Sequence, residues 1–107
     1  MSGLDRELVF SALGDSSRRR LLDRLRVENG LTLSELCDGL DITRQAVTKH
    51  LKVLEAANLV VARRRGREKL HFLNPVPINA VAMRWLREFD ALPLDVLAAL
   101  PAEGNRD

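Results

Sequence analysis

The chain has 107 residues, of which 46% are hydrophobic, 4% aromatic and 30% charged, a composition typical of one folded, helix-rich domain spanning residues 1–107. A single cysteine excludes an internal disulfide, and no apolar run reaches the length of a membrane span. The charged amino terminus lacks the pattern of a secretion signal, so we expect a cytoplasmic protein without a membrane partner.

The net charge of +2 is unevenly distributed along the chain. Residues 43–71 contain eight Lys or Arg and two Glu, a local charge of +6, so the remaining residues sum to −4. Positive charge concentrated on one patterned segment favours nucleic acid as the partner. A solvated charge cluster without a partner is the alternative.

The first predicted helix covers residues 4–13 and has apolar residues on two sides. One side carries Leu4, Leu8 and Ala12, and the other carries a second apolar set around Val9. Because a chain of this size has little material to enclose both sides, we expect a partner chain to cover one of them. A helix wrapped entirely by its own core is the alternative.

A second helix is predicted to begin after Asp15, whose carboxylate can cap it, and to end near residue 30. Its first turn contains Arg18, Arg19 and Arg20. Cations at this end oppose the helix dipole, so we expect these arginines to bind either DNA phosphates or acidic groups of a neighbouring helix.

Residues 32–58 have the pattern of a helix-turn-helix. The spacing in Thr32-Leu33-Ser34-Glu35 predicts a capping box at the start of a short third helix, and only a tight turn separates that helix from the next. Thr43 can cap the fourth helix, and Asn58 can end it in a left-handed conformation.

The fourth helix is predicted to have one buried and one polar face, with Val47, Leu51 and Leu54 on the buried side. A helix of this width fits the major groove of DNA, which makes it a candidate recognition helix. Gln45 and Lys49 are best placed to reach bases. The full predicted DNA-facing set on this helix is Thr43, Arg44, Gln45, Thr48, Lys49, His50 and Lys52.

The periodicity changes to that of a strand over residues 59–73, around Gly66. This pattern predicts a β-hairpin, called the wing below, with Leu70 and Phe72 facing the body. A solvated strand edge protected by charge is the alternative to a DNA-binding role. The residues expected to contact phosphates or enter a minor groove are Arg63, Arg64, Arg65, Arg67 and Lys69.

A last helix is predicted over about residues 77–92, and residues 101–107 should be frayed. Its broad apolar stripe is centred on Trp85. Together with the first helix, this stripe is expected to form a dimer interface through Leu4, Leu8, Ala12, Val81, Trp85 and Phe89.

Three segments resemble the ArsR/SmtB-type winged-helix repressors: residues 8–22, residues 46–55 (AVTKHLKVLE), and Asn58-Leu59-Val60 followed by the Arg-Gly-Arg hairpin. The middle segment is the most specific, and the resemblance covers about residues 4–90. It implies a mainly α fold with a small β-hairpin, a homodimer joined through the first and last helices, and an operator released in response to a signal.

The metal ligands of that family are missing here. Where metal-sensing relatives carry Cys-x-Cys-Asp-Leu, this chain has residues 32–36 without a cysteine, and no histidine follows residue 74. For His50 and His71 we expect local hydrogen bonds or phosphate contacts, and for Cys37 a buried structural thiol.

The sequence therefore predicts a homodimeric transcriptional repressor that binds double-stranded DNA. We expect it to have no cofactor, metal switch or catalytic site. Its effector cannot be read from the residues. The alternatives are a winged-helix protein-interaction module that does not bind DNA, and a repressor with an atypical metal or thiol sensor.

Overall fold

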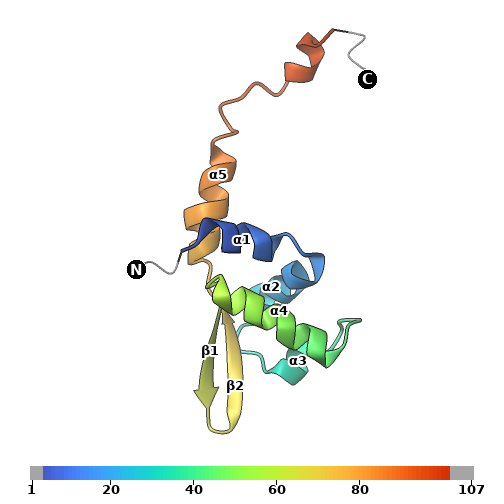
Figure 1. The fold of residues 1–107 in the computed structure, drawn as a ribbon, viewed down its shortest axis with the longest axis vertical. Helices are drawn as coiled ribbons and strands as arrows, with labels where there is room; N and C mark the ends of the chain where they lie inside the picture. Colours follow the sequence, from blue (N-terminus) through green and yellow to red (C-terminus); the bar gives the residue numbers. More distant parts are fainter. Residues whose placement is uncertain (1–3, 102–107) are drawn as a thin grey trace.

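The computed structural model describes residues 4–101, in which helices surround a small core and a β-hairpin projects from them (Figure 1). This arrangement confirms the predicted winged helix-turn-helix. The elements in chain order are α1 (Arg6–Leu13), α2 (Ser16–Val27), α3 (Leu33–Cys37), α4 (Arg44–Ala56), β1 (Val60–Arg65), β2 (Glu68–Leu73), the π-helix η1 (Ile78–Met83), α5 (Arg84–Arg87) and the 3₁₀-helix η2 (Val96–Ala99).

The core forms where α4 packs against α2 and α3. Val47 and Leu54 of α4 are fully buried, and they belong to one cluster with Leu21 and Leu25 of α2 and Leu36 of α3. Fully burying an aliphatic side chain contributes about 1.5–3 kcal/mol, so this cluster is the main source of tertiary stability around α4. The predicted buried face of the fourth helix is confirmed.

Both ends of α4 are fixed by the residues that the sequence indicates. The Thr43 hydroxyl accepts the backbone N–H of Ala46 at 3.0 Å. At the other end Asn58 has φ = 65°, its N–H donates to Glu55 O (3.0 Å), and the N–H of the next residue donates to Leu54 O (2.9 Å). These two bonds are those of a Schellman motif.

The wing is an antiparallel pair in which Val60 lies opposite Leu73 and Arg65 lies opposite Glu68. The turn between them is Gly66–Arg67, and the φ of 64° at Gly66 suits a glycine-first hairpin turn. The predicted hairpin is confirmed.

An isolated β-bridge beside β2 was not predicted. Leu31 bridges to His71 through backbone bonds of 2.8 and 3.2 Å, so β2 lies between β1 and the segment before α3. For this reason Leu70 and His71 are both buried, and Phe72 is only half-buried. The prediction that Leu70 and Phe72 face the body assumed that buried and exposed residues alternate strictly along the strand.

The last helix is shorter than predicted. The helical backbone continues from η1 through α5 and ends at Arg87, not near residue 92, and the following residues form turns that lead away from the body (Figure 1). Phe89 and Leu92 are half-exposed or more, and a helix without a packed face has little to stabilise it. Pro93 further disfavours a helical conformation at Leu92.

Within the described residues, no helix is both long enough and apolar enough to cross a membrane.

The left-handed end of α4 gives the first prediction. Asn58→Ala should lower the free energy of unfolding by about 1 kcal/mol, because a Cβ-bearing residue without a polar side chain is strained at positive φ. Asn58→Gly should cost nothing or stabilise slightly, since glycine adopts this φ freely. Urea unfolding of the three proteins tests this, and an equal loss for Ala and Gly would show that the Asn58 side chain itself matters.

Candidate nucleic-acid interface

The face of α4 opposite the core is polar and cationic. Arg44, Gln45, Thr48, Lys49 and Lys52 line one shallow depression that contains no acidic side chain. These five residues lie within nine positions, and the eight steps between the first and the last cover about 12 Å of helix axis, which is suited to several successive base pairs in a major groove. Thr43 is exposed at the start of the same face.

The tip of the wing carries the second group of cations. Arg63, Arg64, Arg65, Arg67 and Lys69 are all exposed. Arg64 lies directly opposite Lys69, and like charges in opposite positions of a hairpin repel. In the part of the chain that the structure describes, no carboxylate forms an ion pair with any of the five. Their charge is therefore available to an anionic partner.

A cleft of ≈ 560 Å³ separates α4 from the wing. Thr48, Lys52 and Glu55 line it from α4, and Lys69 and Glu68 line it from β2. Cations of both groups, Arg44 and Lys52 from α4 and Lys69 from the wing, therefore line one concave surface.

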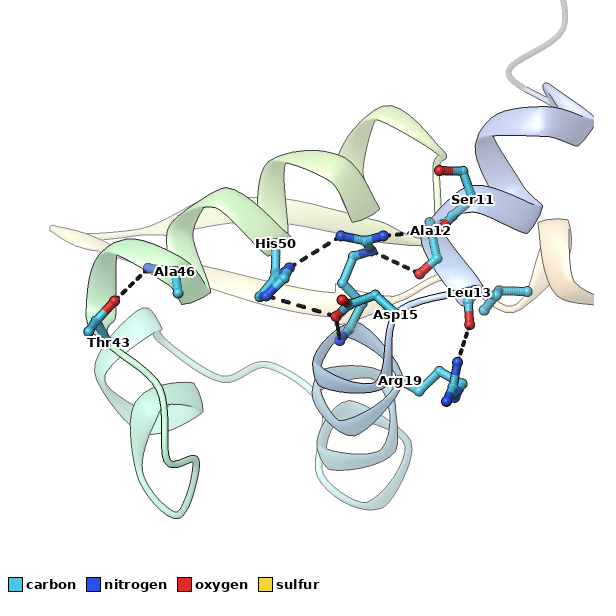
Figure 2. Close-up of polar contacts among 9 residues, drawn as sticks. Ser11, Ala12, Leu13, Asp15, Arg19, Thr43, Ala46 and His50 are labelled. Atoms are coloured by element: carbon cyan, nitrogen blue, oxygen red, sulfur yellow. Dashed lines mark hydrogen bonds and ion pairs between the residues drawn. The ribbon is translucent and has the colours of Figure 1, made fainter.

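His50 does not belong to this surface, which corrects its predicted DNA-facing place. Its side chain is half-buried, with Nε2 3.9 Å from Asp15 Oδ2 and Nδ1 3.3 Å from Arg18 Nη1 (Figure 2). His71 is also held locally, because it is buried and its Nδ1 lies 2.9 Å from Leu31 O. Of the two predicted alternatives for the histidines, local hydrogen bonding is the one that the structure shows.

Two arginines of the first turn of α2 bind the end of α1 rather than acidic groups of a neighbouring helix. Arg18 donates from Nε to Ala12 O (2.9 Å) and from Nη2 to Ser11 O (3.0 Å), and Arg19 donates to Leu13 O (2.7 Å). These carbonyls lie in the last turn of α1, so the cations complement the negative end of the α1 dipole. The sequence pattern missed this because the α1–α2 corner sets the contacts. Arg20 is exposed.

Two of the carboxylates that cap helices have a lowered pKa. Asp15 accepts the backbone N–H of Arg18 at 3.0 Å, which lowers the pKa of that carboxyl, and the positive charges of Arg18 and His50 lower the pKa further. Glu35 accepts the backbone N–H of Thr32 at 2.8 Å and its hydroxyl at 3.1 Å, and both bonds lower the Glu35 pKa. The predicted capping box is present.

A separate surface is apolar. Trp85 lies between Phe10 and Phe89, with ring centroids 5.4 and 5.0 Å away in edge-to-face geometry. The large apolar side chains that are exposed at the start of the chain and over residues 83–89, called the apolar patch below, are Leu4, Leu8, Met83, Trp85, Leu86 and Phe89.

Two residues of the predicted dimer interface are not on this patch. Ala12 is 0% exposed and Val81 is 4% exposed, because α1 and η1 pack against each other within one chain. Assigning them to the interface was wrong: their surface is already covered by the chain itself. The sides of α1 were also divided incorrectly, since Val9 is buried together with Ala12.

The described residues contain no group of three His, Cys, Asp or Glu side chains arranged to hold a metal ion. Cys37 is partly buried against the core cluster, somewhat more exposed than the buried thiol expected.

Known proteins similar to this chain are transcriptional regulators. A family profile described as a helix-turn-helix domain matches residues 13–63. YuzN of Bacillus subtilis, an uncharacterized HTH-type transcriptional regulator, is 42% identical over 88 residues, covering 77% of this chain and 96% of YuzN. The HTH-type transcriptional repressor SmtB of Mycobacterium tuberculosis is 37% identical over 79 residues, covering 69% of this chain and 58% of SmtB. The solved structure of an ArsR-like transcriptional regulator from Rhodococcus sp. RHA1 matches with a TM-score of 0.73 at 33% identity, covering 87% of this chain and 84% of that one.

The lowered pKa of Asp15 predicts an acid-dependent loss of stability. A carboxyl whose pKa is lowered by folding stabilises the folded state above its ordinary pKa, and this contribution disappears as the pH falls through the lowered value. From about pH 4 downward, the wild type should therefore lose more stability than Asp15→Asn, which keeps a capping oxygen but does not titrate. Urea midpoints measured at a series of pH values test this, and parallel curves for the two proteins would contradict it.

Proposed function

Since this chain belongs to the ArsR/SmtB-type family of helix-turn-helix transcriptional regulators, we propose that it is a homodimeric repressor that binds an operator through α4 and the wing. Its relatives are regulators of a non-enzymatic fold, and the chain is a DNA-binding regulator rather than an enzyme. Operator binding, the dimer and the nature of the signal are the proposed parts.

The observation that carries the proposal is the set of cations on the α4 face and the wing that have no carboxylate partner among the described residues. DNA phosphates would neutralise both groups and relieve the repulsion between Arg64 and Lys69. A protein-interaction module has no need of such a concentration of charge, which favours DNA over that alternative. With DNA as its partner, we place the protein in the cytoplasm.

In this proposal the two elements have different roles. Gln45 and Lys49 lie in the first half of α4, on an exposed face of a helix held firmly by its buried side, so they are the residues we assign to base contacts. Thr43, Arg44, Thr48 and Lys52 surround them. The wing arginines flank a two-residue turn and are assigned to phosphates, which require no fixed side-chain orientation.

The apolar patch supports the homodimer. Leu8 is 41%, Trp85 39% and Phe89 48% exposed, and they lie on α1, α5 and the turn after it. Exposed apolar residues on neighbouring elements favour an interaction surface, and a two-fold axis beside α1 and α5 would allow each chain to cover these residues of the other. Such a dimer would present two copies of α4 to one operator.

We further propose that the repressor has no metal switch. The absence of the cysteine pair at residues 32–36 and of a histidine after residue 74 supports this part. The signal that releases the operator is unidentified.

The separate roles of α4 and the wing give a testable pair of variants, once operator sequences have been selected from a genomic pool. Gln45→Ala should reduce the preference for operator over random DNA by about 1–3 kcal/mol, since a base contact is lost. Arg65→Ala should weaken both affinities together and reduce the slope of log K against log salt by about one unit.

Anisotropy titrations of both variants at several salt concentrations measure the affinities for operator and random DNA and the slope of log K against log salt. Arg26→Ala is the matched control, because Arg26 is an exposed arginine at the end of α2 and should change neither affinity. The assignment is reversed if the wing variant loses only operator affinity and the α4 variant loses both equally.

The dimer proposal predicts the effect of a charge on the apolar patch. Leu8→Glu and Leu86→Glu should convert a dimer into a folded monomer and strongly weaken operator binding, because a carboxylate in an apolar interface is not solvated. Sedimentation equilibrium and far-UV circular dichroism measure assembly and folding. Val27→Glu is the control, since Val27 is 78% exposed and lies on α2, outside the patch. A wild-type monomer at micromolar concentration would refute the proposal.

A further inference from the structure

We infer that Arg18 is a positioning residue for operator recognition, because its guanidinium joins the end of α1 to His50 in the middle of α4. The inference rests on the proposed function, since it concerns how accurately α4 is presented to DNA. Arg18 itself lies at the α1–α2 corner and, in this inference, acts through His50 rather than by touching a base.

All three nitrogens of the guanidinium have a partner. Nε donates to Ala12 O at 2.9 Å, Nη2 donates to Ser11 O at 3.0 Å, and Nη1 lies 3.3 Å from His50 Nδ1. The two carbonyls belong to α1, and His50 belongs to α4. A planar fork of donors can hold three partners in fixed directions, whereas the single ammonium group of lysine cannot reproduce this geometry.

The imidazole of His50 faces Arg18 through Nδ1, and its Nε2 lies near the Asp15 carboxylate. A guanidinium only donates hydrogen bonds, so in its bond with Arg18 the Nδ1 atom is the acceptor. Nε2 is 3.9 Å from Asp15 Oδ2, and the same carboxylate oxygen accepts the backbone N–H of Arg18. One turn at the start of α2 therefore supplies both groups that face the ring.

Directional contacts add something that the apolar core does not supply. Val47, Leu51 and Leu54 hold α4 against the body, but packed helices tolerate crossing angles that scatter by about 15–20°. A rotation of about 10° moves atoms on the helix surface, at a radius of about 5–6 Å, by about 1 Å. Such a displacement is enough to spoil a hydrogen bond to a base edge, which requires good distance and angle.

The same guanidinium connects α4 to the helix that carries part of the apolar patch. Leu8 on α1 is exposed on that patch, while Ser11 and Ala12 on α1 accept from Arg18. In the proposed dimer, Arg18 therefore helps to fix the orientation of each α4 relative to the subunit interface, on which the match to two half-sites depends.

Arg19 provides a matched control for a purely structural role. It is adjacent to Arg18, and its Nη1 donates to Leu13 O at the same end of α1. Its hydrogen bonds in the described structure do not include a residue of α4. Both arginines complement the end of α1, but only Arg18 reaches His50.

The test compares Arg18→Ala, Arg18→Lys, His50→Ala, the Arg18→Ala/His50→Ala double variant and Arg19→Ala with the wild type. Operator and random-DNA affinities are measured at several salt concentrations, with urea unfolding and sedimentation on the same samples. Arg18→Ala and His50→Ala should each weaken operator binding about tenfold, within the usual range for coupled groups, and leave random-DNA binding and the salt slope unchanged. Arg18→Lys should not restore the operator affinity, and the double variant should lose no more than either single variant. Arg19→Ala should lose stability without losing operator affinity.

Several results would overturn the inference. Equal losses for operator and random DNA, with the salt slope reduced by one, would make Arg18 a phosphate contact. The same loss of operator affinity in Arg19→Ala would make the effect one of general stability, as would unchanged operator affinity in folded His50→Ala. If Arg18→Ala does not fold, His50→Ala alone decides the question. A wild-type protein that binds no DNA would refute the proposed function itself, which distinguishes that failure from failure of the inference.

Discussion

The burial of one face of α4 is the constraint on which the rest of the structure depends. Val47 and Leu54 are fully buried and Leu51 is 4% exposed, so a large rotation of this helix would expose its apolar side to water. The helical period then turns the opposite face, with Gln45 and Lys49, outward. A short chain thus uses one helix both to complete its core and to present polar groups, and the caps at both ends limit those groups to a defined length of helix.

Two surfaces of the isolated chain are suited to partners of different chemistry, one cationic and one apolar. The α4 face and the wing tip carry cations without carboxylate partners among the described residues, whereas the apolar patch around Trp85 and Leu8 leaves hydrophobic side chains in water. A polyanion would neutralise the cations, and another apolar surface would cover the hydrophobic side chains. Because they lie on separate elements, both partners proposed here can be bound at once, and Arg18 lies between the two surfaces.

Features set by short-range interactions were predictable from sequence. The Thr43 cap and the left-handed Asn58 depend on neighbouring residues, and the outward face of α4 and the exposed wing tip follow from periodicity. Features set by tertiary contacts were not predictable. The period of α4 cannot reveal that His50 faces the α1–α2 corner, and the arginine run gives no sign that Arg18 binds α1 carbonyls. The length of the last helix was overestimated because its apolar residues continue beyond the point where the chain has anything to pack against.

The central claim, that α4 and the wing together form the DNA-binding surface, can be tested through the lysines of the chain. There are three, Lys49, Lys52 and Lys69, and all lie on these two elements. Amine-reactive footprinting of the wild-type protein, free and bound to a selected DNA fragment, measures the accessibility of each lysine directly. The account predicts that all three become protected in the complex, and that raising the salt until the DNA dissociates restores their labelling. Unchanged labelling of all three lysines in a complex that has demonstrably formed would contradict it.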